Sequence, residues 1–478
     1  MHELAKRGHD VTVITPDPVF PKDQAPANLT EIDVHFSYNL FSGIFDVHQG
    51  QKGGFFHQIH EVMETLTTIF EKQLEAPESK ILFDQKFDLV IIEAYVRPAL
   101  AFGHVFKVPI IQYSSFGSNP TAYNMFGAPS HPLLYPSPVA QRVYNLTLFE
   151  KAEELLKFSF IEYVMSTAVD FEYQMMKRTF GNDVPKYEEL QKYVQLLFLN
   201  EHPIWANNHP VPPNIVYVGG IHQSPERKLP KEFQAILDSS KNGVIYISFG
   251  SNVKSSLLPP EKIAVMTKVL SQLPYDVLWK WESDELPGKS DNIKIFKWFP
   301  QADILKHPNV KLFITQGGIQ SADETINAAV PVIGIPMIAD QWYNVEKFVK
   351  NGVGLQINLS ELTETTFENA VRRVIDDKSF KNNMIRLRSL MREHPVDPLE
   401  LAVWWVEHIL RYGGEHLRSP AAGLTWVEYF EVPLVLTALG VCLSVVLVII
   451  LLVFYVLRIV RNLVYGNNNK HVRNKKNK

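Results

Sequence analysis

The stretch FKWFPQADILKHPNVKLFITQGGIQSADETINAAVPVIGIPMIADQWYN, residues 296–344, decides the predicted fold of this chain. Two short apolar runs, Val310–Thr315 and 330–335, are typical of buried parallel strands. Gly317-Gly318 lets the backbone turn sharply after the first run, and Asp340-Gln341 opens a helix after the second. The stretch therefore predicts two successive strand–turn–helix units of a parallel sheet.

The helix after the first strand is predicted to begin with small polar and acidic side chains. Ser321, Asp323 and Glu324 are placed in its first turn. A helix N-terminus presents free N–H groups and a partial positive charge, so it can hold an anion without Lys or Arg, neither of which occurs between Phe313 and Tyr343. Two such strand ends side by side suit a nucleotide that carries a sugar. The glycines alone are more typical of ordinary βα turns in any doubly wound domain.

The composition is that of a globular chain with room for two domains. Of 478 residues, 46% are apolar and 21% charged, and the net charge of −4 gives no reason to expect a nucleic-acid partner. Cys442 is the only cysteine, so neither a disulfide framework nor a cysteine metal site is expected. The 16 histidines lack HExxH or similar spacing, so we expect no metal.

Alternating strand and helix patterns predict an α/β protein with parallel sheets. The first domain is predicted to span 1–201, the linker 202–214 and the second domain 215–412. Strands are expected at 31–38, 87–93, 108–114, 195–200, 215–218, 243–249, 275–281, 292–297, 310–315, 330–335 and 353–357. Helices are expected at 57–74, 139–158, 161–178, 363–377 and 398–412. The Pro- and aromatic-rich loop 117–138 either lines an apolar ligand cleft or packs the domain edge.

The C-terminal segment predicts a membrane anchor. Residues 432–457 contain no charged side chain and are long enough to span a bilayer, with a buried helix of a soluble protein as the alternative. The tail 458–478 is basic, so the positive-inside rule places it in the cytosol and the body on the other side of the membrane. Three glycosylation sequons, at Asn28, Asn145 and Asn358, agree with a luminal body and predict a glycoprotein. The ending KKNK is similar to the dilysine retrieval signal of endoplasmic reticulum membrane proteins.

Three motifs in the 296–344 stretch carry a family resemblance. W-x-P-Q at 298–301, T-Q-G-G-x-x-S-x-x-E at 315–324 and P-x-x-x-D-Q at 336–341 closely resemble the donor-binding block of the UDP-glycosyltransferase family. Gln316 in place of the usual histidine makes the chain most similar to insect membrane-bound members. The resemblance implies the GT-B fold, in which two Rossmann-like domains face each other across a cleft. The N-terminal domain would bind an acceptor and the C-terminal domain a UDP-sugar.

The resemblance also implies a role for each residue of the block. Trp298 offers its aromatic face to the uracil, Gln301 bonds the uracil edge and Glu324 accepts the ribose hydroxyls. The residues expected around the pyrophosphate are Ser251, Gln316, Gly318, Gln320 and Ser321. Asp340 and Gln341 face the sugar hydroxyls. No metal or cofactor is expected beside the UDP-sugar co-substrate, because helix N-termini stabilise the leaving phosphate.

The catalytic base of the family is a histidine that the resemblance places ahead of Leu4, outside this sequence. His2 and His9 do not match its position, and the chain opens in mid-helix without a signal peptide, so we expect an incomplete N-terminus. Glu93 ends the predicted strand 87–93, where the family carries a carboxylate, usually aspartate, that orients the base. Alternatively, Glu93 caps the following helix.

These features together predict an inverting transferase that moves a hexose, expected to be glucose, from a UDP-sugar to a small lipophilic acceptor such as those handled in detoxification. The alternative is a non-catalytic UDP-sugar-binding or partner membrane protein, because the base is absent from the sequence as given. A dehydrogenase is disfavoured because no G-x-G-x-x-G follows a first strand. Acceptor identity, glucose against glucuronate, and a homo-oligomeric state stay open.

Overall fold

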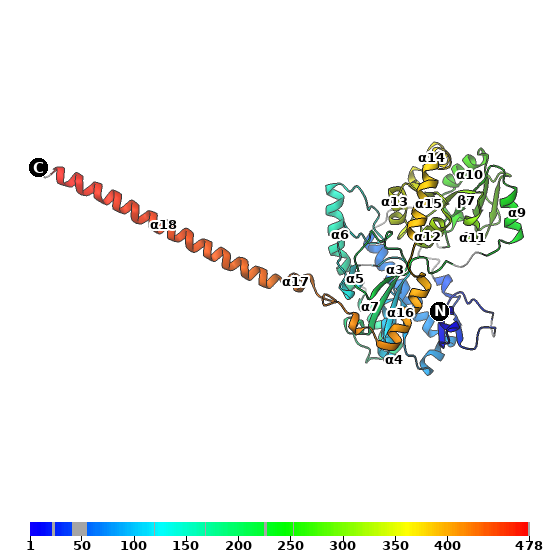
Figure 1. Ribbon diagram of the computed structural model, residues 1–478, viewed down its shortest axis with the longest axis horizontal. Coiled ribbons are helices and arrows are strands. Elements are labelled where there is room, and N and C mark those ends of the chain that lie inside the picture. The colour runs from blue at the N-terminus through cyan, green and yellow to red at the C-terminus, as the bar shows by residue number, and fades with distance from the viewer. Residues whose placement is uncertain are drawn as a thin grey trace. The chain divides into compact units, whose positions relative to one another are not determined.

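The computed structural model describes residues 1–476 except 22–23, 41–54, 119, 168, 224–226 and 252. These residues form two compact units, 1–420 and 421–478. The first unit contains two α/β halves, each built on a parallel sheet. In Figure 1 the N-terminal half is coloured blue to green and the C-terminal half green to yellow.

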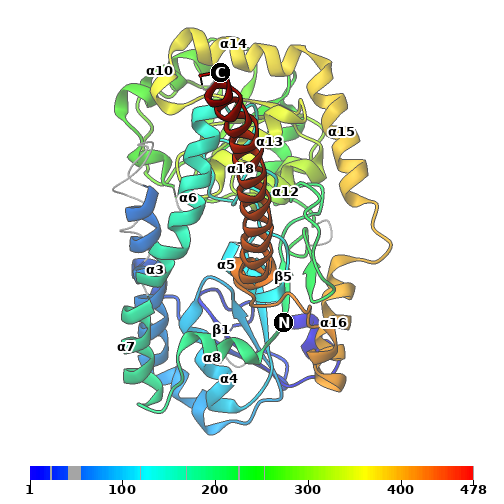
Figure 2. The ribbon, with the colours of Figure 1, turned by 90° about the vertical axis from the view of Figure 1, so that its left-hand side faces the viewer.

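The N-terminal half is built on a four-stranded parallel sheet in the order β3-β4-β5-β6. Its strands are β3 (Val90–Glu93), β4 (Ile110–Ser114), β5 (Val194–Leu199) and β6 (Ile215–Tyr217). A two-stranded parallel sheet pairs β1 (Val11–Thr15) with β2 (Leu29–Asp33). The helices and 3-10 turns (η) are α1 (His2–Lys6), α3 (Phe55–Glu75), η1 (Pro77–Asp84), η2 (Arg97–Leu100), α4 (Ala101–Phe106), α5 (Pro120–Phe126), α6 (Leu148–Thr167), α7 (Val169–Phe180), α8 (Tyr187–Leu190) and η3 (Gln191–Tyr193). Figure 2 shows α3, α6 and α7 packed side by side.

The C-terminal half is built on a six-stranded parallel sheet in the order β12-β11-β10-β7-β8-β9. Its strands are β7 (Val244–Ser248), β8 (Asp276–Lys280), β9 (Ile293–Phe296), β10 (Val310–Thr315), β11 (Val332–Gly334) and β12 (Gly354–Gln356). Its helices and 3-10 turns are α9 (Lys231–Ser239), η4 (Ser255–Leu257), α10 (Pro260–Ser271), α11 (Gln301–Lys306), α12 (Ile319–Ala328), α13 (Gln341–Lys350), η5 (Leu359–Glu361), α14 (Glu364–Asp376) and α15 (Lys378–Arg392). The strand order changes direction between β7 and β10, and this switch point is where open α/β sheets bind ligands.

Both faces of the C-terminal sheet are buried, which explains why its strands read as unbroken apolar runs. Ile245, Ile247 and Ile314 pack in the cluster that includes residues of α10 and α14. Tyr246 and Phe313 belong to the cluster on the other face, with residues of α12, α13 and α15. Alternate residues of a strand point to opposite faces, so strands covered by helices on both sides, such as β7 and most of β10, are mainly apolar.

The boundary between the halves differs from the predicted one. Strand β6 pairs in parallel with β5, so 215–218 belongs to the N-terminal sheet and not to the second domain. Helix α16 (Pro398–Tyr412) returns to that sheet, because its Val406 and Ile409 pack in one cluster with Phe198 and Val216. The assignment of 215–412 to a single C-terminal domain is therefore corrected at both ends. Apolar periodicity shows that a segment is buried but not which sheet buries it.

Two predictions about local structure in the N-terminal half are also corrected. The helix expected at 139–158 begins only at Leu148, because the hydroxyl and backbone N–H of Thr147 both donate to Glu150 and the chain before them is a loop. The loop expected at 117–138 contains α5. The strand expected at 31–38 is β2, which begins two residues earlier, at Leu29, and already ends at Asp33.

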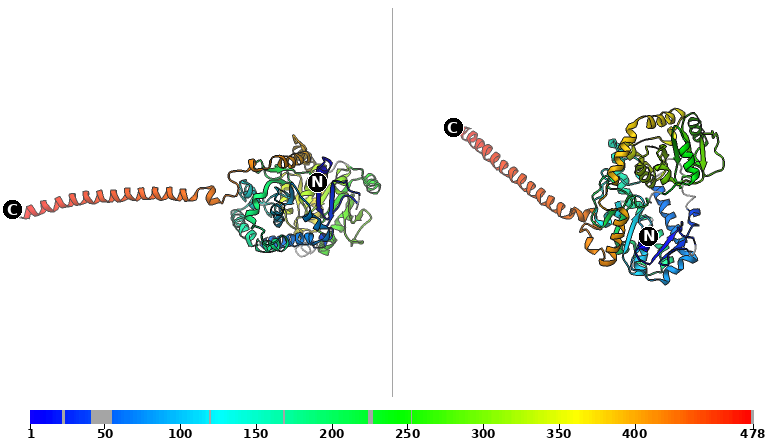
Figure 3. Two further views of the ribbon diagram at one scale, coloured as in Figure 1. Left: turned by 90° about the horizontal axis from the view of Figure 1, so that it is seen from below. Right: turned by 45° about the vertical axis from the view of Figure 1, so that its right-hand side comes forward.

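The second unit consists of α17 (Trp426–Tyr429) and α18 (Val432–Lys476), which follow the 3-10 turn η6 (Glu415–Leu417) of the first unit. Figure 3 shows α18 as one continuous helix. Within it, Val432–Leu463 is long and apolar enough to cross a membrane. An 18-residue window of this segment has a mean hydropathy of 3.1, and none of that window is buried in protein. The predicted span 432–457 lies within this segment, and the alternative of a buried soluble helix is not supported.

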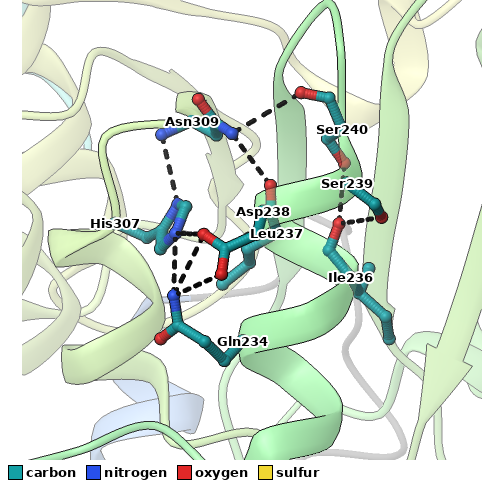
Figure 4. A network of polar contacts seen from close by, with 8 residues as sticks. All are labelled: Gln234, Ile236, Leu237, Asp238, Ser239, Ser240, His307 and Asn309. Atoms are coloured by element: carbon teal, nitrogen blue, oxygen red, sulfur yellow. Dashed lines mark hydrogen bonds and ion pairs between the residues drawn. The ribbon is translucent and has the colours of Figure 1, made fainter.

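A polar network ties α9 to the amino end of β10, at the sheet edge opposite the switch-point turns (Figure 4). The His307 ring accepts from the Asn309 backbone N–H at Nδ1 (3.2 Å) and contacts Asp238 through Nε2 (3.1 Å). Asn309 also donates to the Leu237 carbonyl at 2.9 Å, and the side chain of Gln234 donates to Asp238. Because active sites of parallel sheets lie at the carboxyl ends of the strands, this network is part of the scaffold.

Candidate functional site

Two glycine turns meet at the switch point of the C-terminal sheet. Gly250-Ser251 follows β7, and Gln316-Gly317-Gly318 follows β10. Gly317 has φ +91°, and a Cβ there would lie 2.5 Å from Val345, so only glycine fits. A Cβ on Gly250 would lie 2.5 Å from the amide nitrogen of Gln316, whose side chain is buried between the two turns. The predicted residues Ser251, Gln316 and Gly318 are thus brought together.

A second group of predicted residues forms a hydrogen-bonded cluster at the edge of these turns. The Gln301 amide nitrogen donates to Glu324 Oε2 (2.7 Å) and to Ser321 Oγ (3.0 Å). Its carbonyl oxygen accepts from the Tyr246 hydroxyl at 3.2 Å, which fixes the orientation of the amide. Burial raises the pKa of Glu324. Gln301 therefore positions the carboxylate, and its contact with a uracil edge stays a prediction.

Trp298 lies just before this cluster in the loop between β9 and α11. Its side chain is 68% exposed, which is unusual for tryptophan and leaves a ring face open to a planar ligand. Ser251 and Gln320 are also exposed, so both can reach a ligand at the turns.

The N-terminus of α12 differs from the prediction in its first turn. The helix begins at Ile319 after the N-cap Gly318, so Ile319, Gln320 and Ser321 form the first turn and it contains no acidic side chain. Asp323 and Glu324 therefore lie one turn later than expected. Without a side-chain cap, the backbone N–H groups of this turn remain available, apart from that of Ile319, which donates to Asp340 Oδ2 at 3.0 Å.

Asp340 is the N-cap residue of α13 and connects the two helix tips. Its Oδ2 also accepts from the Asn344 amide at 2.7 Å, and the Asn344 carbonyl oxygen accepts from the Trp205 indole at 2.8 Å. Burial raises the pKa of Asp340 to about 6. Sequence reasoning missed Asn344 and Trp205. Only the i,i+4 spacing of Asn344 from Asp340 could have indicated the first, and nothing local indicates the second.

Gln341 is buried, and its carbonyl oxygen accepts from the backbone N–H groups of Met337 (2.8 Å) and Ile338 (2.9 Å). The side chain therefore shapes the loop before α13. Its contact with sugar hydroxyls stays a prediction. Since the carbonyl oxygen is engaged by two backbone N–H groups, the amide nitrogen would have to make that contact.

In the N-terminal half, polar groups gather at the carboxyl ends of β3, β4 and β5. Glu93 accepts from the Ser115 hydroxyl and from the Ser115 backbone N–H at 3.4 Å. The helical turn η2 that follows β3 has no side-chain cap, so the reading of Glu93 as a helix cap is wrong. Burial raises the pKa of Glu93. Glu201, which sequence reasoning missed, follows β5, and burial raises its pKa to about 7.

Residues of the loop 117–138 line a small cavity beside Glu201, and the reading of this loop as the wall of an apolar ligand cleft stays a prediction. The residues around it include Ser118, Tyr123, Tyr135, His209 and Tyr343. Tyr343 belongs to α13, so the cavity has walls from both halves of the unit.

Three of the contacts that join the two halves at this cleft involve side chains of α12 and α13. Glu346 Oε2 accepts from the backbone N–H groups of Val143 (2.7 Å) and Tyr144 (3.1 Å). Asp323 Oδ2 accepts from the Gly220 N–H at 3.2 Å, and burial raises the pKa of Asp323 to about 7. The third is the Trp205–Asn344 bond. Helices α12 and α13, whose tips form the turn site, therefore also carry the contacts to the N-terminal half.

Comparison with known proteins decides which family this site belongs to. The family model described as UDP-glucoronosyl and UDP-glucosyl transferase matches residues 1–471. The chain belongs to this family of UDP-glycosyltransferases. It is 33% identical to an ecdysteroid UDP-glucosyltransferase of Lymantria dispar multicapsid nuclear polyhedrosis virus over 92% of this chain and 89% of the relative. It is 34% identical to UDP-glucosyltransferase 2 of Dactylopius coccus over 89% and 83%, respectively.

Solved structures confirm the GT-B fold of this UDP-glycosyltransferase. Os79 from O. sativa in complex with UDP has a TM-score of 0.58 at 16% identity, covering 86% of this chain and 96% of that one. The calicheamicin glycosyltransferase CalG4 has a TM-score of 0.54 at 18% identity, covering 86% and 92%. Among the residues described, no group of three or more metal-ligating side chains could hold an ion; the absence of a metal requirement stays a prediction.

Replacing Asn344 by Ala should weaken UDP-sugar binding, because Asp340 would lose the amide that links it to Trp205. The KM for the UDP-sugar is expected to rise about tenfold, the worth of one hydrogen bond to a charged group, while the acceptor KM changes little. Asn351→Ala is the matched control, since that amide donates only to the Lys347 carbonyl of the same helix at 2.8 Å. Equal donor KM values for wild type and Asn344→Ala would contradict the proposed link.

Asp323 should make the enzyme less stable as the pH rises. Its folded pKa of about 7 lies above the ordinary value of 3.8, so the folded state keeps a proton that the unfolded state releases, and stability falls between about pH 4 and 7. Asp323→Asn keeps an acceptor for the Gly220 N–H without the buried charge. The melting temperature of the variant relative to wild type should therefore be higher at pH 8 than at pH 5. A difference that is constant or falls with pH would contradict this account.

Proposed function

We propose that this UDP-glycosyltransferase is an inverting enzyme that transfers glucose from UDP-glucose to a hydroxyl of a small lipophilic acceptor. The observation that carries the proposal is the meeting of the α12 and α13 tips, where Asp340 Oδ2 accepts from Ile319 N–H at 3.0 Å, beside the Gln301–Glu324 cluster. A diphosphate and a ribose are the chemical groups that match this pair of features.

The nucleoside would lie between Trp298 and Glu324. The exposed indole face can stack on uracil, and a carboxylate whose orientation is held by Gln301 can accept from both ribose hydroxyls. The diphosphate would then lie at the uncapped N–H groups of α12 and at the turn of Ser251. Asp340, held by Asn344, would accept from a hydroxyl of the sugar.

In the reaction, the acceptor oxygen attacks the anomeric carbon from the face opposite UDP. The bond from that carbon to the phosphate oxygen breaks, UDP leaves with the electron pair, and the configuration inverts. Preorganised N–H groups at the α12 tip stabilise the charge that develops on the leaving phosphate. The acceptor proton passes to a general base, which the family resemblance identifies as a histidine. Glu93, held by Ser115, would orient that residue.

Relatives support the choice of sugar and acceptor. The viral relative is named for an ecdysteroid acceptor and a UDP-glucose donor, and the relative from Dactylopius coccus is also a UDP-glucosyltransferase. A steroid is a small lipophilic molecule, so an ecdysteroid acceptor agrees with the acceptor class proposed here.

The membrane arrangement is part of the proposal. Val432–Leu463 would span the endoplasmic reticulum bilayer, with the body in the lumen and the basic tail in the cytosol. Lys475 and Lys476, near the chain end, would be read as a retrieval signal.

Glu324→Gln should weaken UDP binding and slow glucose transfer. The loss of the charge that accepts the ribose hydroxyls is expected to raise the Kd for UDP roughly 10- to 100-fold in a calorimetric titration. Glu368→Gln, which removes a carboxylate from an exposed pair with Arg372, is the matched control and should bind UDP like wild type. UDP release and the anomeric configuration of the product are measured with a hydroxylated steroid.

Three results would contradict the proposal in different ways. Undiminished binding by Glu324→Gln would remove the assigned ribose site. A product that retains the configuration of the donor would exclude direct displacement. Tight UDP-glucose binding without turnover would favour the non-catalytic alternative.

A further inference from the structure

The three sequons of the chain differ sharply in how the fold uses their asparagines. We propose that Asn145 carries an N-linked oligosaccharide on the folded enzyme and that Asn28 does not. The inference rests on the luminal body of the proposed function. It is drawn from the exposure and hydrogen bonding of each asparagine, since an N-linked glycan replaces one of the two protons on Nδ2 and needs open space beyond it.

Asn28 cannot carry a glycan in this fold. Its Nδ2 donates to two backbone carbonyl oxygens, of Ala5 at 2.6 Å and of His9 at 3.0 Å. These bonds use both amide protons and hold the end of α1 against the start of β2. A sugar on Nδ2 would remove one bond and would have to occupy the space in which the two carbonyl groups lie.

Asn358 is also engaged by its surroundings. Its Nδ2 donates to Glu361 Oε2 at 3.2 Å, and its carbonyl oxygen accepts from Gln356 at 2.9 Å. Both sides of the amide are therefore held, and the residue is only partly exposed between β12 and η5. Attachment of a sugar would compete with the contact that closes this turn.

Asn145 has neither constraint. It is exposed, and within the described part of the chain its side-chain amide makes no hydrogen bond. Its backbone has φ +54°, a left-handed conformation that asparagine tolerates better than most residues. The flanking backbone is fixed, because the N–H of Tyr144 donates to Glu346 and that of Thr147 to Glu150. The sequon is thus a rigid turn with a free side chain.

The surface next to Asn145 gives a second reason for a glycan there. Leu148 and Phe149, at the start of α6, are 85% and 79% exposed. Neighbouring apolar side chains exposed to this extent promote association in water. Asn145 precedes these side chains by three and four residues, so the first sugars attached to it would lie near them.

The modification is a group transfer from a lipid-linked oligosaccharide diphosphate, supplied with its transferase by the host endoplasmic reticulum. The Asn145 Nδ2 forms a bond to the first sugar carbon, the bond from that carbon to the phosphate oxygen breaks, and the lipid diphosphate leaves. The amide loses one proton, and no oxidant or reductant is needed.

The test expresses the full chain in insect cells behind a cleavable secretion signal, which delivers the body to the lumen whatever its natural orientation. Asn145→Gln should abolish the mobility shift that an N-glycosidase produces. Thr30→Ala and Ser360→Ala destroy the other two sequons without touching the hydrogen bonds of Asn28 and Asn358, and both should keep the full shift. Mass spectrometry after deglycosylation should find Asp at position 145.

A shift that persists in Asn145→Gln, a shift lost in Thr30→Ala, or an unshifted wild type would each overturn the proposal. UDP binding measured on the same preparations tests the proposed function separately, and Asn145→Gln should bind UDP like wild type. Orientation is read from the chain without the added signal. There, Lys476→Thr creates a sequon at Asn474, which would be modified only if the tail were luminal.

Discussion

The structure depends on the contact between two helix tips at the switch point of the C-terminal sheet. Asp340, the N-cap of α13, accepts from the first N–H of α12, so the two tips are held at one place. Parallel strands that diverge at a switch point leave room there. Glycine at 250 and 317 lets the two turns pack closely against Gln316 and Val345. The remaining backbone donors then face one volume, which suits an anion.

The same two helices couple this site to the N-terminal half. On α13, Asn344 joins Asp340 to Trp205, and Glu346 accepts from the loop before α6. On α12, Asp323 accepts from the Gly220 N–H. Helices α12 and α13 therefore carry both the donor-site residues and the contacts between the halves. A displacement of either helix at the cleft would also displace the residues expected to hold the sugar.

The parts of this arrangement that local chemistry determines could be predicted from the sequence. The strand Val310–Thr315 was predicted to the residue. Gln301, Ser321 and Glu324 were each predicted as donor-site residues, and the Gln301 amide lies within hydrogen-bond distance of the other two. The placement of β6 and α16 could not be predicted, since burial pattern does not name the partner. Asn344 and Trp205 were missed for a related reason: their hydrogen bond joins residues 139 positions apart in sequence.

A structure of the enzyme with UDP bound is the most direct test of the central claim. The account predicts uracil on the face of Trp298, ribose hydroxyls on Glu324, and the diphosphate at the tips of α12 and α13 between the two glycine turns. A nucleotide bound elsewhere, or one whose phosphates avoid the N-terminus of α12, would contradict it.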